Sequence, residues 1–387
     1  KHENIKTIIR GRKMIKVMHL IDGGFIGGGQ IHSLALCRNL NKELFHSVVC
    51  ASSKGGFKDL VLESGFEFID INLPKLYRSK NLNELLRKVE RENVNIVHAH
   101  GGVAGMYARF LKKKFECRAK IIHTIHGIHY IHSHNLFRRY SSLYIEQYLA
   151  GYSDAYICET KSDFNAATNM KIIDPSKATI INNGINLSRF MNKTKDEAVG
   201  NKLRITNDDF VIGNVSRFDE QKNQKLLIKI MPDLIKAIPE LKLLLVGDGR
   251  LLNSAKRLAM SLGVTDRVIF AGTRKDLEKI YPLMDVFIFP SLWEGLSLSL
   301  IEALASGKCI VAGNIPSNAE VLVNDENGML FNLHNKNELL ELIVSLFNDR
   351  EKRDYLSDNA IKSSILYDEK IMTEKTEKIY LKLMDKN

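Results

Sequence analysis

The sequence contains few cysteines, and their arrangement favours neither a disulfide framework nor a zinc site. Five cysteines are scattered over 387 residues, and no C-x-x-C pair occurs among them. They are Cys37, Cys50, Cys117, Cys158 and Cys309. An odd number without metal-ligand spacing is typical of reduced thiols in a cytosolic protein. We therefore expect a cytoplasmic protein without structural disulfides.

Long apolar runs are also missing. No stretch approaches the roughly 20 apolar residues of a membrane-spanning helix. The basic start, Lys1 to Lys16, leads only into the short strand-like run Met14 to Ile21, unlike a signal peptide. Apolar residues make up 44% and charged residues 26% of the chain. This composition indicates a globular protein with neither a transmembrane helix nor a secretory signal.

Length and charge suggest two unlike halves. A chain of 387 residues exceeds the size at which a single core stops growing. Residues 1–200 hold 30 Lys+Arg against 18 Asp+Glu, a balance of +12, and residues 201–387 hold 26 against 27, a balance of −1. The basic clusters comprise Arg109, Lys112, Lys113, Lys114, Arg118 and Lys120, and Arg138 and Arg139 beside Leu136, Phe137 and Tyr140. Such clusters can bind nucleic acid, acidic lipid or a phosphorylated substrate, or can be a solvated helix face.

Short β-rich runs alternate with longer amphipathic segments. In the first half the predicted strands are Lys16 to Ile21, Ser47 to Cys50, Asn95 to Ala99, Lys120 to Ile125 and Ala155 to Cys158. In the second half they are Phe210 to Val215, Lys242 to Val246, Arg267 to Phe270, Val286 to Phe289 and Cys309 to Ala312. The alternation predicts an α/β fold with two doubly wound, Rossmann-like parallel sheets. A polar seam at Ser188 to Asn207 separates them, and the chain after Asn332 is predicted to be helical.

Ligands of parallel sheets collect at the carboxyl ends of strands, so functional residues are expected at these ends. After the first strand, Gly27, Gly28 and Gly29 lead into a helix, where backbone can approach a ligand closely. The loop is not the dinucleotide pattern G-x-G-x-x-G, and a plain tight turn is the alternative. After Lys120 to Ile125 comes His126-Gly127, a position suited to function. The nearby His129, His132 and His134 lack a completing carboxylate or cysteine, so no metal is expected there.

Strand ends of the second half carry cations and glycines. Arg217 and Lys222 lie in one strand-to-helix loop, from which both can reach a diphosphate. A surface loop with ordinary charges is the alternative. The next two strands end at Gly247-Asp-Gly249 and at Gly272-Thr273-Arg274.

Two glutamates straddle the next strand-to-helix junction. Glu294 precedes the helix that begins near Leu298, and Glu302 is expected about two turns inside it. The helix N-terminus between them offers unpaired N–H groups to a phosphate, and each carboxylate can accept hydrogen bonds from hydroxyls. A phosphate between two hydroxyl acceptors is what a nucleotide sugar requires.

Along essentially its whole length the chain resembles the family 4 retaining glycosyltransferases of the two-domain GT-B fold. The resemblance rests on the following motifs: Gly27-Gly28-Gly29, His126-Gly127, Asn183-Gly184-Ile185-Asn186, Arg217 with Lys222-Asn223, Gly247-Asp248-Gly249, and Glu294-x7-Glu302 after Pro290-Ser291. It implies two domains facing across a cleft: 1–190, which binds the acceptor, and 191–370, which binds the nucleotide sugar. A C-terminal helix, 371–387, is expected to return to the N-terminal domain.

The resemblance also implies roles for individual residues. Arg217 and Lys222 hold the donor diphosphate, Glu294 accepts from the transferred sugar, and Glu302 accepts from the ribose. The backbone of Leu296, Ser297 and Leu298 binds phosphate, and Thr273 and Arg274 lie near the base. Gly247 and Gly295 are also expected to bind substrate. From the other domain, Gly28 and Gly29 close over the donor and His126 contacts the sugar. Two departures leave the donor open: Glu294-Gly-Leu-Ser297 replaces E-G-F-G or E-G-F-P, and Asn314-Ile-Pro-Ser-Asn-Ala-Glu320 replaces G-G-x-P-E.

Function and partners follow from these assignments. We expect a retaining hexosyltransferase that uses a nucleotide-diphosphate sugar, most simply a UDP-sugar, and a saccharide or lipid-linked acceptor in cell-surface polysaccharide, glycolipid or oligosaccharide synthesis. No D-x-D sequence occurs, so no metal or other cofactor is expected. The basic first half suggests peripheral association with the inner face of the plasma membrane. A nucleotide-sugar epimerase of the same fold is one alternative. The other is a basic nucleic-acid-binding protein, which is disfavoured because the lysine clusters lack interleaved aromatics.

Overall fold

The structure, a computed structural model, describes residues 14–385. The expectation about a signal segment falls mostly on residues 1–13, outside this range, as do residues 386–387 of the predicted C-terminal helix. The chain forms two compact units, which we call the N-terminal unit (to Gly184, and again from Glu369) and the C-terminal unit (Ile185–Asp368). These boundaries lie six and two residues before the predicted 190/191 and 370/371. The chain passes between the units twice, after Gly184 and after Asp368. The N–H of Ile185 donates to the carbonyl of Tyr367 at 2.9 Å, which joins the beginning and the end of the C-terminal unit beside these two points.

Seven parallel strands form the sheet of the N-terminal unit, in the order β3-β2-β1-β4-β5-β6-β7. The strands are β1 (Ile15–Ile21), β2 (Phe45–Ala51), β3 (Glu67–Asp70), β4 (Ile96–His100), β5 (Lys120–Ile125), β6 (Ala155–Cys158) and β7 (Ala178–Ile180). Its helices are α2 (Gly28–Asn39), α3 (Phe57–Glu63), α4 (Ser79–Arg91), α5 (Gly102–Phe115), α6 (Leu136–Leu149), α7 (Lys161–Asn169) and α17 (Glu369–Met384). The strand order reverses between β1 and β4, and the loops that follow these strands flank a switch point.

Six parallel strands form the sheet of the C-terminal unit, in the order β10-β9-β8-β11-β12-β13. The strands are β8 (Phe210–Val215), β9 (Leu241–Val246), β10 (Val268–Gly272), β11 (Val286–Phe289), β12 (Cys309–Gly313) and β13 (Met329–Phe331). The helices are α8 (Leu187–Phe190), α9 (Glu197–Lys202), α10 (Gln224–Ala237), α11 (Leu252–Ser261), α12 (Leu277–Ile280), α13 (Leu298–Ala305), α14 (Pro316–Ala319), α15 (Lys336–Asn348) and α16 (Arg350–Ser364). Here the order reverses between β8 and β11.

The predicted α/β class and its two parallel sheets are confirmed. All ten predicted strands are present, with ends that differ by two residues or fewer. Three strands were not predicted: β3, β7 and β13. Each has only three or four residues and lies at an edge of its sheet. The residues of β3 and β7 are partly or fully exposed, so these two strands lack a long apolar run, and β13 is too short to show one.

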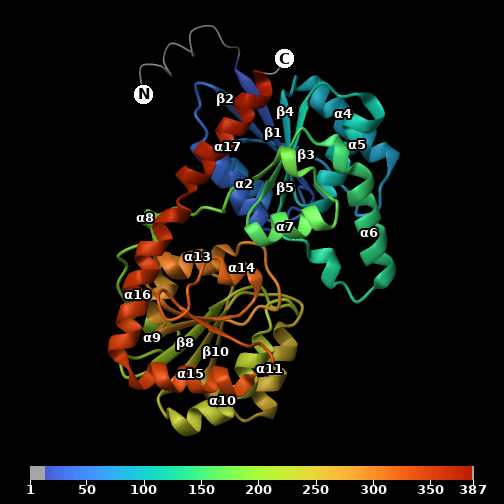
Figure 1. The fold of residues 1–387 in the computed structure, drawn as a ribbon. Coiled ribbons are helices and arrows are strands. Elements are labelled where there is room, and N and C mark those ends of the chain that lie inside the picture. The colour runs from blue at the N-terminus through green and yellow to red at the C-terminus, as the bar shows by residue number, and fades with distance from the viewer. Residues whose placement is uncertain (1–13, 386–387) are drawn as a thin grey trace. The chain divides into compact units, whose positions relative to one another are not determined.

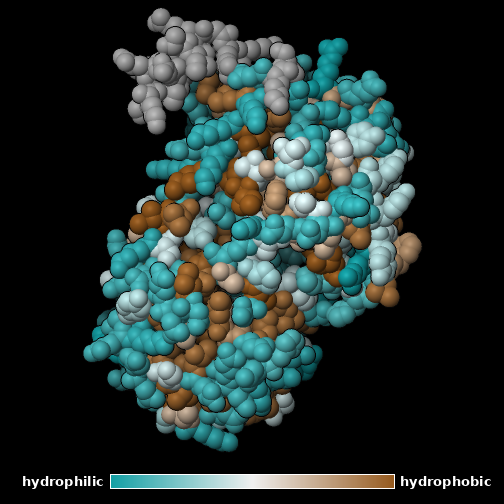
Figure 2. Space-filling view, viewed as in Figure 1, coloured by the Kyte–Doolittle hydropathy of each residue, from teal (hydrophilic) through white to brown (hydrophobic). Residues whose placement is uncertain are grey.

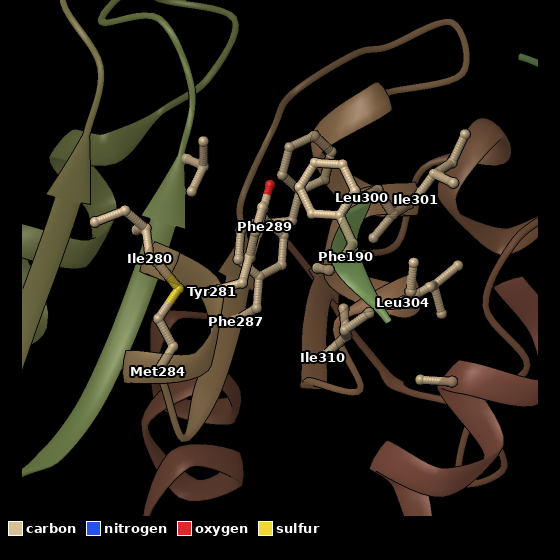
Figure 3. Packing of buried hydrophobic residues seen from close by; sticks show 14 of the residues in the cluster. Phe190, Ile280, Tyr281, Met284, Phe287, Phe289, Leu300, Ile301, Leu304 and Ile310 are labelled. Atoms are coloured by element: carbon tan, nitrogen blue, oxygen red, sulfur yellow. The ribbon is translucent and has the colours of Figure 1, made fainter. Parts of the chain in front are cut away.

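Alternate residues of each strand serve two separate cores. On one face of the C-terminal sheet, Phe287 and Phe289 pack with α13 and with Tyr281, and Figure 3 shows Tyr281 close to Phe190 in this cluster. On the other face, Val286 and Ile288 pack with α10 and α15. Burial on both faces explains why these strands are almost wholly apolar. In the view of Figure 2, hydrophilic residues cover most of the visible surface, and apolar residues gather in smaller patches.

Helix α17 packs on the N-terminal unit, as predicted for the C-terminal helix. It lies beside α2 (Figure 1). Its Met372 and Tyr380 join the core formed by α2 and the strands β1, β4 and β5. The hydroxyl of Tyr380 lies 2.6 Å from Nδ1 of buried His98. The helix therefore covers one face of the N-terminal sheet.

The structure corrects one member of the predicted basic cluster. Arg109 is fully buried, and its guanidinium donates to the carboxylate of Glu146 at 2.7 Å. Lys112 forms an ion pair with Asp154. Arg109 lies on the inner face of α5, which sequence spacing alone did not reveal. It therefore does not contribute to a basic surface.

We predict that Tyr380→Phe destabilises the protein. The substitution keeps the ring but leaves Nδ1 of buried His98 without its hydroxyl partner, at a cost of about 1–3 kcal/mol. Urea unfolding measures the change, and Tyr355→Phe, at a 55% exposed residue of α16, serves as the control with a change under about 0.5 kcal/mol. Equal stability of the two variants would contradict the assignment of α17 as an integral part of this unit.

Candidate active site at the carboxyl ends of the strands

The loops after β8 and β11, the two strands at the switch point of the C-terminal unit, are held together by hydrogen bonds. The amide of Gln221 donates to the carbonyl of Trp293 at 2.7 Å, and the N–H of Leu292 donates to the carbonyl of Gln221 at 2.8 Å. Asn223 donates to the carbonyl of Pro290 at 3.3 Å. Because each loop satisfies polar groups of the other, the charged residues that they carry are fixed relative to one another.

Lys222 and Glu294 meet between these loops. The ammonium of Lys222 forms an ion pair with Oε1 of Glu294, and both side chains are largely shielded from solvent. Oε2 of Glu294 accepts from the amide of Gln221 at 3.1 Å. A charged pair at low exposure is held more firmly than a surface pair. The structure thus places side by side two residues that the sequence predicted in separate diphosphate and sugar roles.

Arg217 lies in the same loop as Lys222 but projects into solvent. Its side chain is 67% exposed and forms an ion pair with Asp219, 2.7 Å away. Asp219 also accepts from the backbone N–H of Lys222 at 3.3 Å. One carboxylate therefore connects the Arg217 side chain with the backbone of Lys222, while the Lys222 ammonium is paired with Glu294. Asp219 was not among the predicted site residues, although its position between Arg217 and Lys222 was the available signal.

Glu302 lies closer to the start of α13 than predicted. Because the helix begins at Leu298, Glu302 is its fifth residue, about one turn inside and not two. Its carboxylate accepts from the hydroxyl of Tyr281 at 2.8 Å. Burial raises the pKa of Glu302 to about 7, although the Tyr281 hydrogen bond opposes this shift. Tyr281 comes from a segment before β11 with no sequence signal for this contact.

The segment from Gly295 to Leu298 forms the entry to α13. Leu296 and Ser297 are buried or nearly so. Ser297 is the N-cap residue, and its side chain makes no capping hydrogen bond to the helix. The backbone N–H groups in the first turn of α13 therefore receive no cap from the Ser297 side chain. Uncapped N–H groups at a helix N-terminus favour the binding of an anion. Glu294 and Glu302 lie on either side of this turn in the sequence.

The remaining predicted residues of this unit lie at the ends of β9 and β10. Gly247 has φ +133°, and a Cβ there would meet the carbonyl oxygen of Ser216 at 2.1 Å. A glycine is thus required for the loop after β9 to pass the loop after β8. Thr273 and Arg274 follow β10, and Arg274 forms two hydrogen bonds with Asp276, at 2.9 and 2.6 Å.

In the N-terminal unit, Gly28, Gly29 and His126 lie at the carboxyl edge of the sheet. Gly28 and Gly29 begin α2, and a Cβ on Gly29 would lie 3.6 Å from the His126 ring. A Cβ on Gly28 would meet no atom within 4 Å. Nδ1 of His126 hydrogen-bonds to the buried carboxylate of Glu159. Gly29 and His126 are therefore neighbours, and Glu159 is a partner that the sequence analysis missed.

Further histidines extend from His126, and no role was predicted for them: His32 and His100 contact its ring, and His19 and His98 contact His100. His19, His32, His98 and His100 are buried. Burial lowers the pKa of His19 to about 3 and that of His32 to about 4. The available signal was the alternation His98-x-His100 at a strand end, which places both rings on one face of the sheet.

Comparison with known proteins identifies the family. Residues 26–189 match the model for Glycosyltransferase Family 4, and residues 195–363 match the model for Glycosyl transferases group 1. The chain belongs to the family 4 glycosyltransferases, and it is a glycosyltransferase. Among the described residues, no helix is long and apolar enough to cross a membrane.

Curated relatives and solved structures agree with this assignment. An Escherichia coli protein named UDP-Gal:alpha-D-GlcNAc-diphosphoundecaprenol alpha-1,3-galactosyltransferase is 26% identical over 87% of this chain and 89% of its own length. Alpha-monoglucosyldiacylglycerol synthase of Acholeplasma laidlawii is 25% identical over 78% and 79%. The fold matches that of Anabaena HepE in complex with UDP-glucose, with a TM-score of 0.83, 18% identity and coverage of 96% and 100%. The fold is therefore GT-B.

We predict that Glu302→Gln stabilises the ligand-free protein at pH 8 more than at pH 5. The folded-state pKa of about 7 exceeds the ordinary value of 4.5, so the folded state binds more protons, and stability falls as pH rises from about 4.5 to about 7 and stays low above it. Glutamine removes this cost, which is on the order of 1–3 kcal/mol at pH 8.

Thermal melting of both proteins at the two pH values measures this effect. Glu351→Gln, at an exposed position of α16, provides the control and is expected to change the melting temperature equally little at both. The same gain for Glu302→Gln at pH 5 and pH 8 would contradict a raised pKa for Glu302.

Proposed function

We propose that the protein is a retaining, metal-independent hexosyltransferase that moves a sugar from a UDP-sugar to a saccharide or lipid-linked acceptor. The observation that carries the proposal is the shielded Lys222–Glu294 pair beside the entry to α13, at the switch point of the C-terminal sheet. The names of two similar proteins support it, since one contains UDP-Gal and diphosphoundecaprenol and the other a diacylglycerol product. The solved complex of HepE with UDP-glucose supports a uridine nucleotide.

Departure of the diphosphate is the step that the C-terminal unit is equipped to assist. When the bond between the sugar C1 and the diphosphate oxygen breaks, negative charge develops on the leaving group. Lys222 is a shielded cation held by Glu294, Arg217 is an exposed cation of the same loop, and the N–H groups of α13 add positive potential. In this proposal these groups perform the task that a metal ion performs elsewhere, so a chelator does not reduce the rate.

Glu294 orients the donor and is not the nucleophile. Its carboxylate is held by Lys222 and Gln221, and such a group is suited to accept hydrogen bonds from sugar hydroxyls. Retention then follows from attack on the face that the leaving group occupies. The acceptor oxygen forms the new bond to C1 while a phosphate oxygen takes the acceptor proton, and no enzyme group becomes covalently linked.

In the N-terminal unit, His126 and the start of α2 are proposed to contact the donor sugar and phosphate. The open space at Gly28 and the neighbouring ring of His126 are compatible with these contacts. Glu302 is proposed to accept from the ribose, with Thr273 and Arg274 near the base and Gly247 as a further substrate-binding residue. These roles rest on the family resemblance together with the positions described above.

We predict that Lys222→Ala lowers kcat for nucleotide release from a UDP-sugar by about 10²–10³-fold, because a preorganised charge is lost from the transition state. Glu294→Gln is expected to raise KM and lower kcat, since the amide keeps the shape but not the charge. The matched control is Lys225→Ala, an exposed lysine of the next helix, with unchanged kinetics.

A screen across UDP-, GDP- and ADP-sugars, with and without chelator and monitored by circular dichroism for folding, performs this test. Sugar transfer with retained anomeric configuration supports the proposal. Release of a 2-epimer with no transfer would favour a nucleotide-sugar epimerase instead. Binding to none of the donors, or full activity of folded Lys222→Ala, would refute the proposed site.

A lipid-linked acceptor at a membrane surface is favoured by helix α6. An exposed aromatic stripe runs along this helix: Phe137, Tyr140, Tyr144 and Tyr148. Arg138 and Arg139 are exposed beside it, and Lys113 lies 4.4 Å from the centre of the Tyr148 ring. Aromatic residues flanked by cations suit the interface of an anionic bilayer. The alternative of a basic nucleic-acid-binding protein is disfavoured, because it leaves the residues of the GT-B site without a function.

We predict that the protein sediments with anionic liposomes and that Phe137→Ser/Tyr140→Ser lowers the bound fraction several-fold. The aromatic pair contributes apolar burial, and the flanking cations make the binding weaker at physiological than at low salt. Tyr355→Ser, at an exposed aromatic residue of α16, is the control. Absence of salt-sensitive binding by the unmodified protein would refute membrane association, with no consequence for the donor site.

A further inference from the structure

Three histidines converge at the carboxyl edge of the N-terminal sheet. His32 comes from α2, His100 ends β4 and His126 follows β5, and one ring nitrogen of each lies within 4.8 Å of the others. Nδ1 of His100 is 3.3 Å from Nε2 of His126. Two nitrogens bound to one tetrahedral Zn²⁺ at ~2.0–2.1 Å lie about 3.3 Å apart. The spacing of this pair therefore suits two ligands of one ion.

Each of the three rings is held through its other nitrogen. Nδ1 of His126 bonds to the carboxylate of Glu159, and Nδ1 of His32 bonds to Oδ1 of Asn183 at 2.6 Å. Nε2 of His100 lies 3.2 Å from Nδ1 of His19. Metal-bound histidines characteristically donate their second N–H to a carboxylate, a carbonyl or a similar acceptor, which fixes the tautomer. A carboxylate, an amide oxygen and an imidazole fill these outer positions here.

A second group of three histidines nearby does not show this pattern. His19, His98 and His100 also bring ring nitrogens within 4.8 Å of one another. Both nitrogens of His98, however, bond to hydroxyls at 2.6 Å, those of Tyr380 and Thr124. No nitrogen of His98 then remains for an ion. The two groups share His100. Only in the first group does every ring use one nitrogen for its outer partner and keep the other nitrogen for an ion.

The first group also has the chemistry and access that an ion requires. Neutral imidazole is the form that binds metals, and burial lowers the pKa of His32 and of His100 below the ordinary value. His126 is not fully enclosed, since its side chain is 16% exposed. Three nitrogen ligands with one side towards solvent are the arrangement of an open zinc site.

We propose that His32, His100 and His126 form a site for one divalent transition-metal ion, with Glu159, Asn183 and His19 as the outer shell. Three imidazoles favour Zn²⁺, Co²⁺, Ni²⁺ or Cu²⁺ over Mg²⁺ or Ca²⁺. The ion is coordinated by Nε2 of His126, which is then unable to contact a sugar. On the proposed function, in which His126 contacts the donor sugar, it therefore inhibits transfer, while the cations of the C-terminal unit still act without a metal.

Binding is tested on the full chain after treatment with a chelator, by titration with Zn²⁺ in competition with a chromogenic chelator. We expect one ion per chain, with the affinity lowered at least about 100-fold in His32→Gln and in His126→Gln. Glu159→Gln changes no ligand, and the loss of an outer-shell carboxylate lowers the affinity by about 10–100-fold. His132→Gln/His134→Gln, which alters other histidines of the same unit, is the matched control with unchanged affinity.

Co²⁺ provides a readout that depends neither on activity nor on the folding of a variant. The unmodified protein is expected to develop the visible absorption of four-coordinate Co²⁺ with nitrogen ligands, and Zn²⁺ is expected to abolish it. Failure to develop this absorption, or to bind Zn²⁺ saturably, would overturn the proposal and leave a chain of imidazole hydrogen bonds only. Undiminished affinity in folded His32→Gln and His126→Gln would place the ion elsewhere. Neither result affects the measurement of nucleotide release from a UDP-sugar, which tests the role of Lys222 and hence the proposed function.

Discussion

Burial of both faces of a parallel sheet is the constraint on which this structure depends. Strands such as β11 and β12 have helices on either side, so their residues are apolar almost without exception. Polar chemistry is then confined to the carboxyl ends of the strands, where loops and helix N-termini supply hydrogen bonds. Gly28, Gly29 and His100 follow or end the strands at the reversal of order in the N-terminal unit, β1 beside β4, and Lys222 and Glu294 follow those of the C-terminal unit, β8 beside β11. His126 follows the next strand along, β5.

The same edge serves opposite electrostatic purposes in the two units. In the C-terminal unit it carries permanent charges, Lys222 against Glu294 and Arg217 against Asp219, in loops that hydrogen bonds hold together. In the N-terminal unit it carries imidazoles that burial keeps neutral, as the lowered pKa values of His19 and His32 indicate. Fixed charge suits the stabilisation of a leaving group. Neutral rings with free lone pairs suit hydrogen bonding or metal binding.

The sequence predicted the architecture and the positions of the site residues better than it predicted their contacts. Regular alternation identified ten strands because each has a continuous apolar run, whereas β3 and β7 are short, exposed edge strands without one. Glu294 and Lys222 were each placed at a strand end, but their pairing depends on β8 and β11 being neighbours in the sheet. Tyr281 beside Glu302, and the imidazoles around His126, depend on packing between distant segments. Contacts of this kind have no local signal.

The return of α17 to the N-terminal unit has a consequence for synthesis. Residues up to Gly184 emerge from the ribosome first, yet Tyr380 and Met372, which complete one of their cores, are made nearly two hundred residues later. Until then, α2 and the neighbouring strand surface lack their cover, and Nδ1 of His98 lacks its hydroxyl. The C-terminal unit, whose residues are contiguous, faces no such delay. The unit translated first is thus completed last, and one of its apolar faces stays uncovered during that interval, when such a surface is prone to aggregation.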